Sequence, residues 1–298
     1  MDYISFKLEL FGEIKNFPLV VEYGFHDTDM FLHNHTDFYE LTIILSGSAV
    51  HIVNNEKYII RKGDVFVVGR DLIHGFEKPS NFKICNIMYK PEIILNTTHD
   101  IQESAGFHAL FVLEPYLSRD FQFTNHLQLT VSTFETANQL ISALVQEYQS
   151  QNIGRTTILY SLFWNLVVLL ARAYQIENQP KDSLLNIAVP LAYINKNYCN
   201  PITVEDLASQ AYMSVRNFSR VFHKAYGISP INYVIQLRIQ HAYDLLQNPD
   251  ISISEIAYLC GFQDSNYFTR QFKHASGFTP REYRDFLLES GREYRRSR

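Results

Sequence analysis

The pattern of hydrophobic positions changes twice along this 298-residue chain. From about residue 4 to 95, short β-branched runs such as 41–45, 51–53 and 64–68 alternate with polar, turn-forming residues. The separating segments are Ser46-Gly47-Ser48, Asn54-Asn55-Glu56 and Lys62-Gly63-Asp64. Many short strands at this spacing predict a β-sandwich or a β-barrel.

The pattern becomes helical after Pro91. Apolar residues recur at steps of three or four, the period of an amphipathic helix, at Leu127, Val131, Phe134, Ala137, Ile141, Leu144 and Tyr148. Residues 158–174 are apolar nearly all round, so this second helix must be covered on most sides. Ser161, Asn165 and Arg172 interrupt the run, which is too short and too polar to span a bilayer. We expect residues 101–177 to support the barrel and to mediate dimerisation.

A polar segment around Pro180 separates these helices from the C-terminal third and is typical of a linker. From there to about residue 288 the periodicity is again helical. The sequence therefore predicts an α+β multidomain chain. Its parts are a β-barrel at 1–100, the helical segment at 101–177, the linker at 178–183 and an all-α domain at 184–290.

An internal repeat dominates the C-terminal third. Residues 203–233 align with residues 252–283, and seven identities recur at an offset of 50. The identical pairs are Phe218 and Phe268, Arg220 and Arg270, Phe222 and Phe272, Ala225 and Ala275, Gly227 and Gly277, Pro230 and Pro280, and Tyr233 and Tyr283. Ala208 matches Ala257 at an offset of 49, so the intervening turn is one residue longer in the second copy.

Each copy carries the signals of two short helices joined by a tight turn. Hydroxyl or carboxylate side chains stand where helices should begin, and a glycine stands where the second helix should end. This arrangement is a helix-turn-helix, whose second helix lies in the major groove of DNA. The capping residues are Thr203 and Ser252 for the first helices, Ser214 and Asp264 with Ser265 for the second, and the terminating glycines are Gly227 and Gly277.

A long helix is predicted between the two copies, from about Pro230 to Gln247. At about 1.5 Å per residue it would be roughly 27 Å long. That length can hold two recognition helices about one turn of DNA, some 34 Å, apart. A single chain could then read two adjacent major grooves.

The second helix of each copy has one apolar and one polar face. In the first copy the apolar face carries Val215, Phe218, Val221 and Phe222. Arginine reads guanine edges and asparagine reads adenine edges, whereas serine, threonine and lysine suit phosphates. The predicted DNA-contacting residues are Arg216, Asn217, Ser219, Arg220 and Lys224 in the first copy and Ser265, Asn266, Thr269, Arg270 and Lys273 in the second.

The distribution of charge supports a polyanionic partner for the repeat. The net charge of the chain is −5, but residues 1–180 hold 12 Lys and Arg against 20 Asp and Glu, a balance of −8. Residues 181–298 hold 14 against 11, a balance of +3, and ten of these fourteen cations are arginines. Such asymmetry indicates a polyanion-binding part attached to an acidic part, and we expect the partner to be double-stranded DNA.

These residues also resemble a known family. Residues 257–273 (AYLCGFQDSNYFTRQFK) and 277–284 (GFTPREYR) are similar to the second half of the AraC/XylS-type DNA-binding domain, and the likeness spans about 185–288. The resemblance implies a transcription regulator, commonly an activator that contacts RNA polymerase beside a promoter. It also implies recognition positions at Arg216, Asn217, Ser219 and Arg220 in the first unit and at Asn266, Thr269 and Arg270 in the second.

The predicted barrel contains a group of residues suited to binding. Two histidines separated by one residue on a strand, His33 and His35, point to the same side, and Glu40 further along can join them. With Gly47 they resemble the first cupin motif, His-x-His-x4-Glu-x6-Gly, and His74 stands at the place of the histidine of the second motif. The likeness covers about 20–90 and is similar to sugar-responsive AraC-type sensor domains, the rhamnose regulators among them.

The second cupin motif is degraded, because Gly69 stands where its proline is expected and Asp71 where its second glycine is expected. Three interpretations therefore stay open. The group binds a divalent metal, or it hydrogen-bonds a sugar or another small molecule, or it consists of fold residues with no ligand. The predicted metal ligands are His33, His35, Glu40 and His74, and the predicted ligand-binding set is His33, His35, Tyr39, Glu40, His74 and Phe76, with Phe66 and Tyr89 as further walls.

A metal-dependent cupin enzyme is the competing function. The DNA-binding repeat argues against it, and the sequence contains no nucleophile–base constellation, so we predict no catalytic residues. The remaining histidines, among them His51 and His108, have no partner pattern and are expected at the surface.

Three widely spaced cysteines, Cys85, Cys199 and Cys260, indicate buried thiols in a reducing compartment. The N-terminus lacks the layout of a secretory signal. We expect a cytoplasmic, homodimeric regulator controlled by a small-molecule effector in the barrel, with ligand-independent DNA binding as the alternative.

Overall fold

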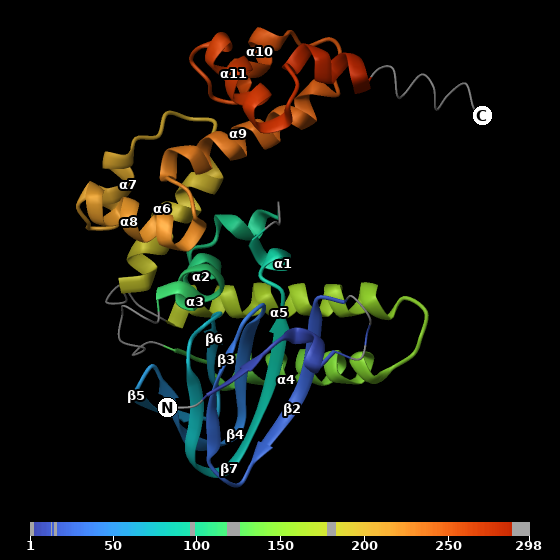
Figure 1. Ribbon diagram of the computed structural model, residues 1–298, viewed down its shortest axis with the longest axis vertical. Helices are drawn as coiled ribbons and strands as arrows, with labels where there is room; N and C mark the ends of the chain where they lie inside the picture. The colour runs from blue at the N-terminus through green and yellow to red at the C-terminus, as the bar shows by residue number, and fades with distance from the viewer. Residues whose placement is uncertain are drawn as a thin grey trace. The chain divides into compact units, whose positions relative to one another are not determined.

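The computed structural model describes residues 3–12, 14, 17–95, 99–117, 126–177 and 183–287 (Figure 1). The chain forms two compact units, Met1–Val189 and Pro190–Arg298. Their boundary falls inside helix α6 (Ser183–Asn197). The expected linker falls on residues 178–182, which lie outside the described residues.

The strands of the first unit form one sheet in the order β1-β3-β7-β4-β6-β8, with β2 also paired to β7 and β5 to β4. They are β1 (Ile4–Phe6), β2 (Leu19–His26), β3 (Met30–His35), β4 (Tyr39–Val53), β5 (Glu56–Arg61), β6 (Asp64–Val68), β7 (His74–Tyr89) and β8 (Leu127–Gln128). The 15-residue β4 and the 16-residue β7 pair with each other, and each pairs with two further strands on its other edge. The sheet therefore curves (Figure 1), and we call the face on which Phe66, Phe76 and Ile84 pack together the barrel interior.

Residues 39–53 form one continuous strand, so the turn predicted at 46–48 is wrong. Gly47 has a φ of +71°, and a Cβ atom there would lie 2.1 Å from the carbonyl oxygen of Ser80. The glycine thus allows β4 and β7 to approach closely at a shift in their register, and the strand bends without reversing. The other two predicted turns are confirmed, with left-handed backbone at Asn54, Asn55 and Gly63.

Helices cover one part of this sheet (Figure 1). They are η1 (Leu8–Leu10), α1 (Glu92–Leu95), η2 (Asp100–Glu103), α2 (Ala105–Phe107), η3 (His108–Leu113), α3 (Glu114–Leu117), α4 (Val131–Gln149) and α5 (Arg155–Glu177). Helix α4 begins after Thr130, whose side chain accepts a hydrogen bond from the backbone N–H of Thr133. Leu127, which the periodicity assigned to this helix, instead pairs with β6 as part of β8.

Helix α5 has 23 residues, more than the sequence pattern predicted. By length and composition alone, Arg155–Gln175 could cross a membrane, with a mean hydropathy of 1.4. One face of the helix packs inside the unit, where Phe163 contacts Tyr89 of β7 with ring centroids 5.4 Å apart. At Gly106 of α2 the two backbones are so close that a Cβ atom would lie 2.0 Å from the carbonyl oxygen of Ala171. These contacts identify α5 as a core helix of the first unit.

The second unit contains the part of α6 from Pro190 onward and, as predicted, two helix-turn-helix pairs. The first pair is α7 (Val204–Gln210) and α8 (Val215–Tyr226), the second is α10 (Ile253–Leu259) and α11 (Ser265–Ser276), and α9 (Pro230–Leu246) connects them. The predicted caps are confirmed, because the side chains of Thr203, Ser214, Ser252 and Asp264 each accept a backbone N–H of the following turn. Ser265 is the first residue of α11, not its cap.

The second helix of each pair ends as the sequence predicted, at a left-handed glycine, with φ of 73° at Gly227 and 81° at Gly277. The apolar sides of these helices build the core: Phe218 and Phe222 of α8, like Phe268 and Phe272 of α11, are fully buried. Val215, predicted on the apolar face of α8, is 40% exposed.

Candidate functional site

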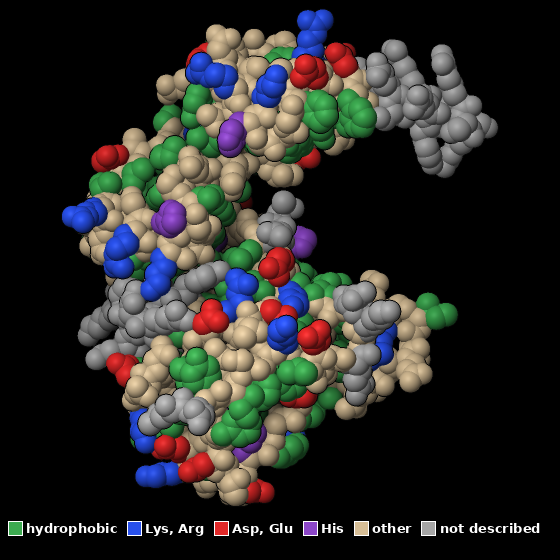
Figure 2. Space-filling view, in the orientation of Figure 1, with side chains coloured by type: hydrophobic (Ala, Val, Ile, Leu, Met, Phe, Trp, Pro, Cys, Tyr) green, Lys and Arg blue, Asp and Glu red, His purple; other side chains and the backbone are tan. Residues whose placement is uncertain are grey.

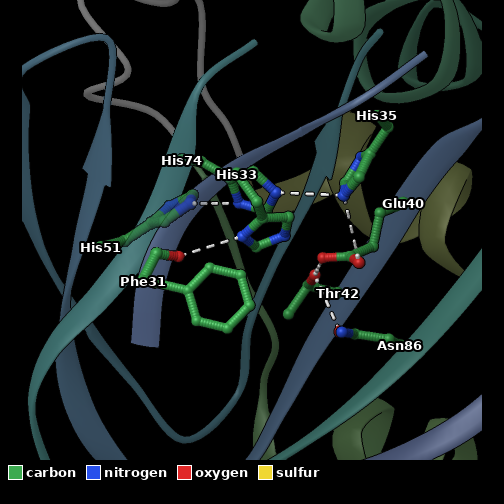
Figure 3. Close-up of polar contacts among 8 residues, drawn as sticks. All are labelled: Phe31, His33, His35, Glu40, Thr42, His51, His74 and Asn86. Carbon is green, nitrogen blue, oxygen red and sulfur yellow. Dashed lines mark hydrogen bonds and ion pairs between the residues drawn. The ribbon is translucent and has the colours of Figure 1, made fainter. Parts of the chain in front are cut away.

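The predicted binding residues of the barrel come from three neighbouring strands. His33 and His35 share one side of β3, and His33 lies directly opposite His74 of β7. Glu40 lies on β4, and its side chain points toward His35 (Figure 3). The alternation of side chains along strands and the pairing of β3, β7 and β4 therefore bring all four predicted metal ligands into the barrel interior.

A fourth histidine, His51, joins them, and we call His33, His35, His51 and His74 the histidine cluster. Nε2 of His51 lies 3.3 Å from Nδ1 of His74, and Nε2 of His74 lies 3.2 Å from Nε2 of His35. Nδ1 of His33 donates to the carbonyl oxygen of Phe31 at 3.2 Å (Figure 3). A hydrogen bond between two imidazoles needs one N–H and one bare nitrogen, so the accepting ring of each pair is neutral.

Polar contacts continue from the cluster through Glu40. Oε2 of Glu40 lies 3.6 Å from Nε2 of His35. The Thr42 hydroxyl donates to Oε1 of Glu40 at 3.1 Å and also lies 3.1 Å from Oδ1 of Asn86 (Figure 3). A line of buried polar side chains thus runs across the interior from His51 to Asn86.

Burial controls the protonation of this group. His33, His35, Glu40 and His74 are each 4% exposed or less. Burial, reinforced by the neighbouring His33, lowers the pKa of His35 to about 3, and it lowers the pKa of His74 well below its usual range. Burial raises the pKa of Glu40 to about 8, although the Thr42 hydrogen bond opposes this shift. At neutral pH the interior therefore presents neutral imidazoles beside a carboxyl group that is mostly protonated.

The arrangement fits a divalent transition metal. One nitrogen each of His33, His35 and His74 lies within 4.8 Å of the other two. Imidazole nitrogens bind zinc at about 2.0–2.1 Å, so nitrogens grouped this tightly can share one ion after small adjustments. The Phe31 carbonyl holds the ring of His33 and His51 holds that of His74, as second partners of metal-bound histidines do.

The interior also offers polar atoms to an uncharged ligand. Among the described residues, Nδ1 of His35 is a polar atom of this interior that is buried without a hydrogen-bond partner. Buried polar groups are rarely left in this state. A hydroxyl-rich molecule or an ordered water could satisfy it.

The aromatic walls divide between two faces of the sheet. Phe66 stacks on His51 with ring centroids 4.5 Å apart, and Phe76 lies 5.1 Å from the same ring. Tyr39 instead pairs with Tyr89 at 6.0 Å, on the face that Phe163 of α5 covers. The structure brings Phe66 and Phe76 to the cluster, and it does not bring Tyr39 or Tyr89 there.

The surface positions expected for His51 and His108 are wrong, because they are 0% and 1% exposed. Strict alternation from Glu40 would put His51 on the opposite face of β4, but register shifts near Gly47 turn it inward. Two other interior residues were missed, although the sequence contained a sign of each. Thr42 follows Glu40 by two positions, and Asn86 is an isolated polar residue in an apolar strand.

A second candidate site lies on α8 and α11. Figure 2 shows Lys and Arg side chains on the surface over α7 and α8 and over α10 and α11. None of the ten predicted DNA-contacting residues is buried. Arg216, Arg220, Asn266, Arg270 and Lys273 are exposed, and Asn217, Ser219, Lys224, Ser265 and Thr269 are half-buried.

Three side chains on this surface, Arg220, Asn217 and Thr269, already take part in hydrogen bonds. Nη2 of Arg220 donates to Oδ1 of Asn217 at 3.1 Å, one turn earlier on α8. The Thr269 hydroxyl donates to the carbonyl oxygen of Ser265 at 2.9 Å. The two helices thus present an arginine at the same place, Arg220 or Arg270, with different surroundings.

Comparisons with known proteins find relatives for both parts of the chain that carry these sites. The model of the AraC-like ligand binding domain family matches residues 19–163, and that of a helix-turn-helix domain family matches residues 207–285. The HTH-type transcriptional activator RhaS of Escherichia coli O1:K1 is 28% identical over 254 residues, which cover 85% of this chain and 87% of that protein.

Two solved structures are also similar. The DNA-binding domain of AdpA in complex with a target DNA is 31% identical and covers 35% of this chain and 95% of its own, with a TM-score of 0.34. An apo ToxT from Vibrio cholerae is 16% identical and covers 91% of this chain and 98% of its own, with a TM-score of 0.35.

Proposed function

We propose that this chain, which belongs to the AraC-type family of transcription regulators, activates transcription when a small-molecule effector binds in its barrel interior. The relative RhaS is named an activator, and we extend that sign of regulation to this chain. In this proposal α8 and α11 enter successive major grooves, the chain contacts RNA polymerase beside a promoter, and it acts as a cytoplasmic homodimer without catalytic activity.

One observation carries the DNA-reading part of the proposal. Arg220 and Arg270 are exposed at equivalent positions of two helices whose opposite sides are packed into the core. A guanidinium presented from a major-groove helix can bind two acceptors of a guanine. The neighbouring polar side chains are of kinds that contact phosphates or other base edges.

Selection of bound sequences from a random DNA pool tests this assignment. Arg220→Ala and Arg270→Ala should each relax base choice in one half-site and cost about 1–3 kcal/mol of binding free energy there. Binding of the wild type should weaken steeply with salt. Unchanged sequence profiles for both variants would contradict the assignment of these arginines.

For the effector we favour a polar small molecule, and the resemblance to sugar-responsive sensors implies a carbohydrate. The buried, unpartnered Nδ1 of His35 supports a hydroxyl-bearing ligand, and Phe76 offers an apolar wall. If the effector binds one of two arrangements of the protein more tightly, its binding would change the placement of the DNA-binding helices.

The close grouping of nitrogens from His33, His35 and His74 favours a second candidate ligand, a divalent cation. With Glu40, these residues would hold it, and the ion would supply a fixed positive charge to the interior. An ion could act alone or could anchor a sugar hydroxyl.

Elemental analysis of purified protein, followed by thermal-shift measurements with sugars before and after chelation, separates these candidates. A sugar-dependent shift that survives chelation and is lost in His35→Ala supports the small molecule alone. A shift that requires added cobalt or zinc supports the ion. Lack of any shift would favour ligand-independent DNA binding.

A further inference from the structure

Arg270 does not stand free on α11. Its Cζ atom lies 5.9 Å from the ring centroid of Tyr267, the residue one turn earlier. A guanidinium at this distance from an aromatic face is attracted to it. Tyr267 is 37% exposed, so the contact is at the surface but is not fully solvated.

Tyr267 is itself held from behind. Its ring lies 6.1 Å from that of Phe262, at an interplanar angle of 61°. Phe262 is only 3% exposed and lies in the turn before α11. Edge-to-face packing of this kind fixes the orientation of both rings.

Phe262 in turn contacts Arg238 of the connecting helix α9. Its Cζ atom lies 5.6 Å from the ring of Phe262. Its Nε donates to the carbonyl oxygen of Tyr198 at 2.6 Å and its Nη2 to that of Asn200 at 2.9 Å. Arg238 is therefore anchored to the backbone between α6 and α7.

These four side chains also line one open hollow of about 520 Å³. The hollow gives the long side chain of Arg270 room for other conformations. Contact with Tyr267 opposes this freedom.

The first helix-turn-helix pair holds its arginine, Arg220, in another way. Asn217 stands 50 positions before Tyr267, and it accepts a hydrogen bond from Arg220 at 3.1 Å. The same position thus carries a hydrogen-bond acceptor on α8 and an aromatic ring on α11.

We propose that Tyr267 is a positioning residue that presets Arg270 for base reading, backed through Phe262 by Arg238. Arg270 is then set by packing of the second helix-turn-helix pair against α9, whereas Arg220 is set within its own helix by Asn217. This inference rests on the proposed reading role of Arg270. Presetting matters because ordering a long side chain on binding costs conformational entropy, and a side chain already held in place loses less.

A double-mutant cycle on the full chain tests the inference, with affinity and base preference measured against the selected DNA site. Tyr267→Leu should weaken DNA binding about fivefold. It should also reduce the preference for particular bases at the positions read by α11. The first half-site and the salt dependence should not change. Tyr267→Phe, which keeps the ring, is the matched control and should behave as the wild type. Tyr267→Gln provides a second truncation, and circular dichroism confirms folding of each variant.

In the Arg270→Ala background, Tyr267→Leu should have no further effect, because the tyrosine acts through the arginine. A full fivefold loss in that background would overturn the inference, as would an unchanged base profile for both truncations. If Arg270→Ala itself leaves the profile unchanged, the proposed reading role fails instead, so the two failures are distinguishable.

Discussion

Nε2 of His35 and Nε2 of His74 face each other at 3.2 Å in the barrel interior. Both residues belong to the group of three histidines that can share a metal ion. A nitrogen lone pair that accepts a hydrogen bond cannot bind a metal at the same time. A metal ion bound through these two nitrogens would therefore take the place of the hydrogen bond between the rings.

The first prediction concerns metal binding to this pair. Adding cobalt or zinc to the chelated protein should raise its melting temperature, because a ligand that binds only the folded state stabilises it by about 2.7 kcal/mol at one hundred times its Kd. His35→Ala should abolish the increase, measured by differential scanning fluorimetry. His274→Ala, at an exposed position of α11, is the control. An equal increase in His35→Ala would show that the metal binds elsewhere.

The second prediction concerns the buried hydroxyl of Thr42, which contacts both Glu40 and Asn86. Thr42→Val keeps the shape but leaves these two polar groups without that partner, which should cost about 2 kcal/mol of unfolding free energy. Urea denaturation gives the value. Thr157→Val, at an exposed position of α5, should change stability by less than about 0.5 kcal/mol. If the two variants are equally stable, water replaces the lost hydroxyl.

The third prediction compares two glycines with the same left-handed backbone. Gly261 has a φ of +87°, and a Cβ atom there would lie 2.4 Å from the carbonyl oxygen of Cys199. Gly227 has a φ of +73° and open space around it. Gly227→Ala should cost about 1–2 kcal/mol for the backbone conformation alone. Gly261→Ala should cost a further amount of about 1–3 kcal/mol for the clash. Equal losses in thermal denaturation would mean that the loop around Cys199 yields freely.

The fourth prediction concerns pH and His108. Burial lowers its pKa to about 4, although a hydrogen bond from Nε2 to the Gln102 carbonyl opposes the shift. The unfolded histidine takes up a proton near pH 6.5, so its contribution to stability is complete above that pH and is lost as the pH falls toward 4. Across this window the loss should approach about 3 kcal/mol. Between pH 7 and pH 4, the unfolding free energy of His108→Gln should therefore fall by about 3 kcal/mol less than that of the wild type. Parallel curves for the two proteins would contradict the shifted pKa.

Local signals in the sequence were sufficient to predict where the helix-turn-helix helices of the C-terminal unit begin and end. Caps such as Thr203 and Asp264, and the terminating Gly227 and Gly277, act within one helical turn, and the structure has them where the sequence predicted. The recurrence of Arg220 and Arg270 at an offset of 50 placed both on exposed positions without any knowledge of packing.

The barrel was less readable because its interior depends on strand register. The spacing of His33 and His35 correctly placed them on one side of β3, since alternation holds over two residues. Alternation failed for His51, because bulges between it and Glu40 reverse the side on which later residues lie. It also could not tell that Tyr39 faces the helices, because both faces of this sheet are covered by apolar groups.

The sequence by itself determined the kinds of unit in this chain, since helix caps, turn glycines and hydrophobic periods are properties of neighbouring residues. Tertiary structure alone decided which side chains meet, as His51 meets His74 and as Arg238 supports Phe262. These pairs are 23 and 24 positions apart along the chain. Their contact depends on how whole strands and helices pack, a free energy spread over many residues that no short pattern contains.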